Sequence, residues 1–137
     1  MEIRPITPRY AVSPQIEPHD IVEIAAAGYT TILCNRPDGE IPAELQADVI
    51  RAATEAAGLT FKELPLTHDT IEAVVAAQMQ IVETAPGPVF AYCASGTRCT
   101  IVWALGQVGR MSAEDIVAAA QSAGYDLSSM ASRLDPA

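Results

Sequence analysis

The segment Val89–Thr100 constrains the fold more than any other part of the chain. An apolar run of β-forming residues ends at Cys93, a loop of small residues follows, and a helical pattern begins after Arg98. This order predicts a strand, a tight loop and a helix, with backbone N–H groups arranged as an anion-binding nest. Such a position lowers the pKa of a thiol from about 8.5 towards neutrality or below. Cys93 is therefore a candidate thiolate nucleophile and Arg98 a candidate oxyanion ligand; the loop between them is Ala94, Ser95, Gly96 and Thr97.

Short β-forming runs alternate with helical patterns along the rest of the chain. Two short strands near a sheet edge are expected within residues 4–13, and further strands at 29–34, 59–66 and 89–92. Helices are expected at about 17–28, 42–57, 71–82, 101–108, 113–124 and 127–134. The alternation predicts an α/β fold, a three-layer sandwich with a mainly parallel central sheet flanked by helices. At this length, residues 1–137 are expected to form one domain.

Charge and composition exclude several classes of partner and cofactor. Eight basic and seventeen acidic residues give a net charge of −9, which argues against nucleic acid and anionic membranes as partners. No apolar stretch approaches the roughly 20 residues of a membrane span. Two distant histidines and no Cys-x-x-Cys pair predict no metal site, and the absence of a glycine-rich nucleotide loop predicts no cofactor. Three cysteines in unrelated contexts fit reduced thiols in the cytoplasm; the oligomeric state is left open.

Ligand sites in such sheets form at the carboxyl ends of the strands, where two further loops are expected. In the loop Thr67–Asp69, Asp69 is a candidate general acid, although an aspartate near a helix start is also a common cap. His68 is a lesser candidate, since a histidine there is more often simply exposed. In the loop Asn35–Glu40, Arg36 and Asp38 are candidates to add a second cation to the site or to orient water. Alternatively, these residues only form a turn.

Several other residues near Cys93 are candidates for a part in the site, and some of them have a purely structural alternative. Gly96 allows the backbone to turn towards a ligand, whereas Ser95 and Thr97 either donate hydrogen bonds to the thiolate or ligand or cap the helix. Cys34 and Cys99 are candidate redox partners of an oxidised Cys93. Alternatively, Cys34 is a small buried hydrophobic residue.

The sequence resembles a known family over nearly its whole length, and two segments are the specific parts of the resemblance. Asn35-Arg36-Pro37-Asp38-Gly39-Glu40 and Cys93-Ala94-Ser95-Gly96-Thr97-Arg98 resemble the phosphatase-like domain of the beta-lactamase-hydrolase-like proteins, a branch of the protein tyrosine and dual-specificity phosphatase superfamily. The resemblance implies a protein tyrosine phosphatase-like sandwich, with Cys93 as nucleophile and Arg98 as oxyanion ligand. It also implies Asp69 as general acid, and it places Cys34 like the redox-trapping cysteine of some superfamily members.

The sequence departs from the superfamily signature at three points. Tyr92 stands where histidine is usual, four residues rather than five separate Cys93 from Arg98, and Cys99 replaces the serine or threonine that normally follows the arginine. The shorter loop is similar in length to the sulfur-carrying loop of rhodaneses. The leading hypothesis is a hydrolase of phosphate monoesters, acting on a small anionic substrate or a phosphoprotein through a thiophosphoryl-Cys93 intermediate. The alternatives are a sulfurtransferase that carries a Cys93 persulfide and a non-catalytic module that binds an anion or a protein.

Overall fold

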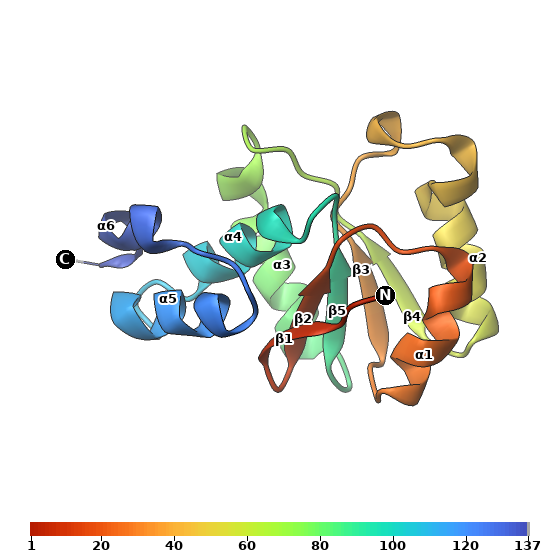
Figure 1. Ribbon diagram of the computed structural model, residues 1–137, viewed down its shortest axis with the longest axis horizontal. Coiled ribbons are helices and arrows are strands. Elements are labelled where there is room, and N and C mark those ends of the chain that lie inside the picture. The colour runs from red at the N-terminus through yellow and green to blue at the C-terminus, as the bar shows by residue number, and fades with distance from the viewer. Residues whose placement is uncertain (137) are drawn as a thin grey trace.

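The computed structural model describes residues 1–136 and contains a five-stranded sheet between two groups of helices (Figure 1). The strands are β1 (Arg4–Thr7), β2 (Tyr10–Ser13), β3 (Thr31–Cys34), β4 (Thr60–Glu63) and β5 (Val89–Tyr92). Their order is β1-β2-β5-β3-β4, and only the β1–β2 pair is antiparallel. The predicted α/β sandwich with a mainly parallel sheet is therefore confirmed.

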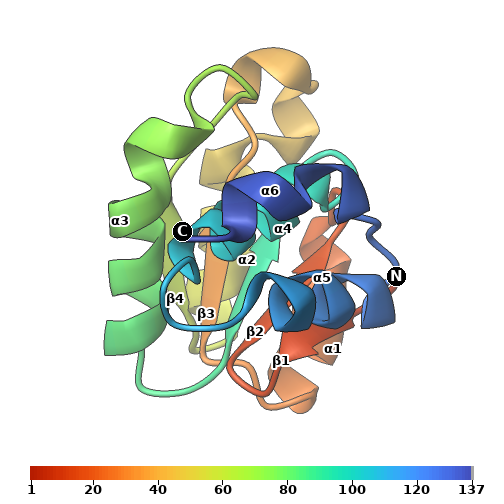
Figure 2. The ribbon, with the colours of Figure 1, turned by 90° about the vertical axis from the view of Figure 1, so that its left-hand side faces the viewer.

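Helices cover both faces of the sheet. They are α1 (Ile21–Ala26), α2 (Ala47–Ala56), α3 (Ile71–Thr84), α4 (Thr97–Gly106), α5 (Ala113–Ser122) and α6 (Ala131–Leu134). In Figure 1, α1 and α2 lie to the right of the sheet and the other four to its left, while Figure 2 shows α5 and α6 in front of α4. None of these helices is long and apolar enough to cross a membrane.

The hydrophobic clusters on the two faces of the sheet follow from the alternation of side chains along each strand. In β5 the side chains of Phe90 and Tyr92 pack with those of α1 and α2, whereas Val89 and Ala91 pack on the opposite face with those of α4 and α5. All four residues of β5 are buried, as expected for a strand with neighbours on both sides and helices on both faces.

Two expected elements differ from the structure. The helix expected at 42–57 begins only at Ala47, because Gln46 is extended (φ −69°, ψ 165°) and separates α2 from a short 3₁₀ turn, Ala43–Leu45. The strand expected at 59–66 is regular only over β4. The two short strands expected near a sheet edge are found there, with β1 at the edge and β2 next to it.

The carboxyl ends of β3, β4 and β5 meet at one end of the sheet, the upper end in Figure 1. There the Asn35 N–H donates to the Tyr92 carbonyl at 2.9 Å, and the Leu66 N–H donates to the Asn35 carbonyl at 3.0 Å. These bonds join the beginnings of the three loops that the sequence singles out. The loops therefore leave the sheet side by side.

Candidate active site

Cys93 lies between β5 and α4, with its side chain fully buried. The Gly96 N–H donates to its Sγ at 3.2 Å, and the backbone N–H groups of Arg98 and Cys99 also interact with the sulfur. The loop thus wraps its donors around the sulfur at the N-terminus of α4. This is the nest expected of a short strand–loop–helix connection.

These contacts make the Cys93 thiol acidic. A hydrogen bond with the Cys99 side chain is the largest cause, and the backbone donors of Cys99, Gly96 and Arg98 add to it; together they outweigh burial and lower the pKa of Cys93 to about 5. The Cys99 thiol shows the opposite effect, because complete burial and the neighbouring Cys93 sulfur raise its pKa well above the ordinary value. The opposite directions of the two shifts make Cys93 the more acidic of the two thiols.

Gly96 holds the loop in a conformation that other residues rarely adopt. Its φ is +94°, and a Cβ at this position would collide with the hydroxyl of Tyr125. That hydroxyl donates to the Ser95 carbonyl at 2.9 Å. The loop therefore requires glycine both for its backbone and for the close approach of Tyr125.

Ser95 and Thr97 bond to each other. The Ser95 hydroxyl donates to Thr97 Oγ1 at 2.9 Å and accepts from the Thr97 N–H at 3.3 Å. The Ser95 hydroxyl thus binds the N–H of the first residue of α4, while Gly96 is the N-cap residue and makes no side-chain cap bond. Ala94, the first loop residue, provides a carbonyl that accepts from the Gln15 N–H at 3.2 Å.

Arg98 is nearly buried and is held by two other loops. Its Nη1 donates to Glu40 Oε2 at 2.9 Å and to the Leu66 carbonyl at 3.0 Å, and its Nη2 donates to Glu40 Oε1 at 2.7 Å. The Glu40 carboxylate raises the pKa of Arg98, and the charge of Cys93 adds to this effect. The guanidinium thus lies within electrostatic reach of the Cys93 sulfur. The contact with Glu40 was not anticipated from the sequence.

Arg36 and Asp38 have different surroundings. The Arg36 guanidinium binds Glu40 Oε1 at 3.2 Å and Gln15 Oε1 at 3.2 Å, so it is linked to Arg98 through a shared carboxylate. Asp38 Oδ1 accepts the Ala47 N–H at 2.8 Å at the start of α2. Asp38 thus has the surroundings of the turn alternative, whereas Arg36 places a second cation against Glu40.

Asp69 and His68 lie on the loop after β4 and are exposed. Both line a cavity of about 460 Å³ with Ile101 of α4 and Arg133 of α6. This loop begins at Leu66, whose carbonyl binds Arg98, and Ile101 is three positions after Arg98 on α4. Asp69 is therefore connected to the neighbourhood of Arg98 but is not among the groups that set the pKa of Cys93.

The two other cysteines lie on opposite faces of the sheet. Cys99 belongs to the same core cluster as Cys93 and its thiol bonds to the Cys93 sulfur. Cys34 belongs to the other cluster, beside Tyr92, and its thiol donates to the Arg36 carbonyl at 3.4 Å. The structure thus brings Cys99, but not Cys34, into contact with Cys93.

A buried polar network next to Cys99 was not predicted from the sequence. The side-chain amides of Asn35 and Gln78 bond reciprocally at 2.9 Å, and Gln78 Nε2 donates to the Tyr10 hydroxyl at 3.1 Å. That hydroxyl donates to the Cys99 carbonyl at 2.8 Å. A signal existed in the sequence, because Gln78 is a polar residue on the apolar stripe of α3, between Val74 and Val82.

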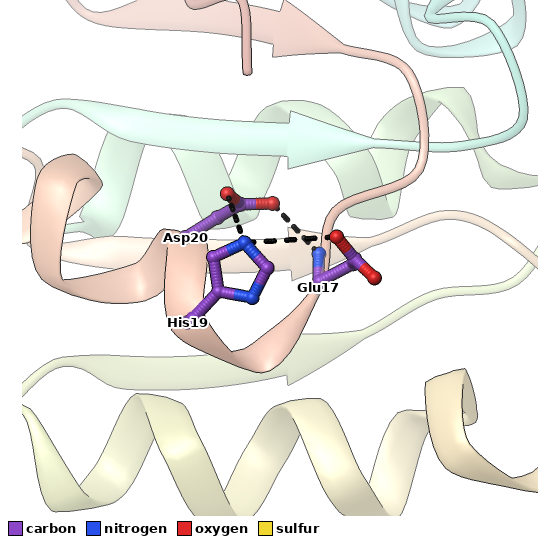
Figure 3. Close-up of side chains that lie close together, drawn as sticks. All are labelled: Glu17, His19 and Asp20. Carbon is purple, nitrogen blue, oxygen red and sulfur yellow. Dashed lines mark hydrogen bonds and ion pairs between the residues drawn. The ribbon is translucent and has the colours of Figure 1, made fainter.

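A further polar cluster lies at the 3₁₀ turn η1 (Pro18–Asp20) and its N-cap residue Glu17. Glu17, His19 and Asp20 place one ligand atom each within 4.8 Å of the others (Figure 3). Asp20 Oδ2 accepts the Glu17 N–H at 2.8 Å, which is half of a capping box. His19 Nε2 lies 3.6 Å from Glu17 and 3.5 Å from Asp20. Capping explains the position of Asp20, and Glu17 and His19 are exposed.

Comparisons with known proteins agree with this architecture. A family model described as beta-lactamase hydrolase-like protein, phosphatase-like domain, matches residues 2–110. A beta-lactamase hydrolase-like protein of Xylella fastidiosa is 35% identical over 130 residues, which cover 93% of this chain and 30% of the relative. The chain therefore spans less than a third of the length of this curated relative.

Solved structures show the same fold. The crystal structure of a proposed phosphatase from Neisseria meningitidis has a TM-score of 0.88 and 36% identity, and the match covers 98% of this chain and 97% of that one. A Cys-to-Ser variant of TpbA from Pseudomonas aeruginosa, crystallised with phosphotyrosine, has a TM-score of 0.67 and 17% identity over 96% of this chain and 80% of that one. At that identity the likeness establishes the fold alone.

Proposed function

Because the chain belongs to the phosphatase-like domain family of the beta-lactamase hydrolase-like proteins, we propose that it is a cysteine-dependent hydrolase of phosphate monoesters. The observation that carries the proposal is the Cys93 sulfur, whose pKa is lowered to about 5 within a loop of N–H donors at the N-terminus of α4. A thiolate in such a nest is a nucleophile at neutral pH, and the nest suits the anion that it would attack. The expected substrate is a small phosphate ester or a phosphoprotein, handled by one domain in the reducing cytoplasm.

In the proposed reaction, the Cys93 thiolate attacks phosphorus and the ester oxygen leaves. Arg98 and the loop N–H groups bind the non-bridging oxygens and stabilise the charge of the transition state. Asp69 is the proposed donor of the proton to the leaving group. Water then cleaves the thiophosphoryl enzyme, which releases phosphate and restores the thiolate.

Turnover of p-nitrophenyl phosphate between about pH 5 and 8 tests this proposal. Wild-type protein is expected to be active, whereas Cys93→Ser and Arg98→Ala are expected to lose activity. The matched control is Cys34→Ser, which alters a buried thiol on the opposite face of the sheet and should keep its activity. A wild-type protein that turns over none of several phosphate esters in this range would overturn the proposal.

A sulfurtransferase is the second candidate, favoured by the four-residue loop between Cys93 and Arg98 and by the exposed position of Asp69. In that reaction the Cys93 thiolate takes the outer sulfur of thiosulfate, sulfite leaves, and an acceptor thiol later removes the sulfur. No general acid is needed. Asp69→Asn should therefore impair a phosphatase and leave a sulfurtransferase unchanged. A protein that binds phosphate but shows neither activity would be the non-catalytic module.

A further inference from the structure

Glu40 is the group in closest polar contact with the proposed anion ligand. It ends the 3₁₀ turn Asp38–Glu40 in the loop after β3, and both of its carboxylate oxygens accept from Arg98, at 2.9 and 2.7 Å. Arg98 is 8% exposed, so this is a two-point contact with a nearly buried guanidinium. Charge-assisted pairs of this geometry fix orientation as well as supplying energy.

The donors of Arg98 show which edge of the guanidinium remains open. Of its five N–H bonds, the two on Nη1 are used by Glu40 and by the Leu66 carbonyl, and one on Nη2 is used by Glu40. The remaining donors are Nε–H and the second N–H of Nη2, to which the structure assigns no partner within residues 1–136. These two bonds are parallel and form the fork that matches two oxygens of a tetrahedral anion.

A second arginine, Arg36, also binds the Glu40 carboxylate. Arg36 Nε binds the same Oε1 atom at 3.2 Å, so the carboxylate lies between two arginines. Hydrogen bonding to Arg98 is the largest cause that lowers the pKa of Glu40, and Arg36 adds to it. Glu40 is therefore ionised at neutral pH and unsuited to donate a proton. The three side chains together carry one net positive charge in a chain of net charge −9.

We propose that Glu40 is a positioning residue: it holds one edge of Arg98 so that the free Nε–Nη2 fork faces a tetrahedral anion bound at the Cys93 loop. The inference rests on the role of Arg98 as anion ligand in the proposed function. It assigns the loop after β3 a part in anion binding, through the contact of Glu40 with Arg98.

Glu40 could instead block Arg98, and that role predicts the opposite effect on anion binding when the carboxylate is removed. If Glu40 were a plug that competes with the anion for Arg98, removing its charge would strengthen anion binding. If Glu40 holds Arg98 in place, removing its charge frees the guanidinium to rotate and leaves Arg36 and Arg98 repelling each other. Anion binding would then weaken, on the order of tenfold or more, because small losses of positioning are costly in such sites.

The test is protection of Cys93 from iodoacetamide by inorganic phosphate, at constant ionic strength, with the modified peptide identified by mass spectrometry. In Glu40→Gln the half-protecting phosphate concentration is expected to rise about tenfold, with partial recovery in Glu40→Asp. The matched control is Glu44→Gln, a nearby exposed carboxylate, which should behave as wild type. Alkylation without phosphate shows whether the thiolate itself is intact in each variant, which a merely misfolded loop would not preserve.

Unchanged or tighter phosphate binding in Glu40→Gln would overturn the inference, and so would a wild-type protein that phosphate does not protect. Because the assay needs no turnover, it separates the two proposals. Protection that depends on Glu40 in a protein without phosphatase activity would uphold this inference while the proposed function fails.

Discussion

The acidity of Cys93 gives a quantitative prediction, because its largest cause is one removable group. The Cys99 thiol donates to the Cys93 sulfur, and this bond heads the contributions that lower the pKa of Cys93 to about 5. Replacing Cys99 by alanine removes that donor and leaves the backbone N–H groups of the loop in place. The substitution should therefore raise the pKa of Cys93 without restoring an ordinary thiol.

The size of the shift follows from the kind of bond. Hydrogen bonds to charged groups contribute roughly 1.5–3 kcal/mol, and a thiol is a weak donor, so the low end applies. At about 1.4 kcal/mol for each pKa unit, Cys99→Ala should raise the pKa of Cys93 by about one unit. Cys99→Ser keeps a hydroxyl donor at this position and should stay closer to wild type than Cys99→Ala.

The assay is the rate of Cys93 alkylation by iodoacetamide between about pH 4 and 9, since only the thiolate reacts appreciably. Cys34→Ala is the control, because its thiol lies on the other face of the sheet. Circular dichroism at each pH establishes that the variants are folded. Equal midpoints for wild type and Cys99→Ala would refute the assigned role of Cys99, and a wild-type midpoint near 8.5 would refute the whole account of the loop.

Three further predictions concern the same loop. First, hydrogen peroxide should oxidise Cys93 to a sulfenic acid, which the Cys99 thiol then attacks with loss of water. Peptide mapping should therefore find a Cys93–Cys99 disulfide in wild type and in Cys34→Ser. A Cys93–Cys34 disulfide would contradict this prediction. Second, the pKa of Cys93 is depressed on folding, so its contribution to stability is complete above the unfolded thiol pKa and lost as pH falls to about 5. The difference in urea stability between wild type and Cys93→Ala should thus grow with pH over this window, by at most about 1.4 kcal/mol per unit, and a constant difference would count against a native thiolate. Third, Gly96→Ala should lower the free energy of unfolding by about 1–3 kcal/mol, and the melting temperature with it. Adding Tyr125→Phe removes the colliding hydroxyl and should restore part of the stability. A Gly96→Ala variant as stable as wild type would show that the loop tolerates a Cβ.

The sequence was most informative where structure depends on local order. The strand, the loop and the helix around Cys93 follow from residues adjacent in the chain, and the α/β class follows from the alternation of such segments. The start of α2 was misjudged because a single extended residue, Gln46, interrupts a region whose composition suits a helix.

Contacts between distant loops were beyond the sequence analysis. Glu40 and Arg98 are 58 positions apart, and their pairing depends on how two strand-to-helix connections fold over the same end of the sheet. The choice between Cys34 and Cys99 is of the same kind. Alternation along β3 and β5 directs Cys34 to one face and leaves Cys99, at the start of α4, on the other. Gln78 is different, because a polar residue on the apolar stripe of α3 is a local signal of a buried network, although no role was predicted for it.

The central claim, that Cys93 is the nucleophile of a phosphatase, is tested most directly by trapping the intermediate. Wild-type protein mixed with p-nitrophenyl phosphate and quenched rapidly in denaturant should carry an adduct of about 80 Da on the Cys93 peptide, absent from Cys93→Ser. Turnover of the ester with no adduct on Cys93 would contradict the claim. So would a protein that never forms this adduct but gains about 32 Da on Cys93 from thiosulfate, the mark of a persulfide.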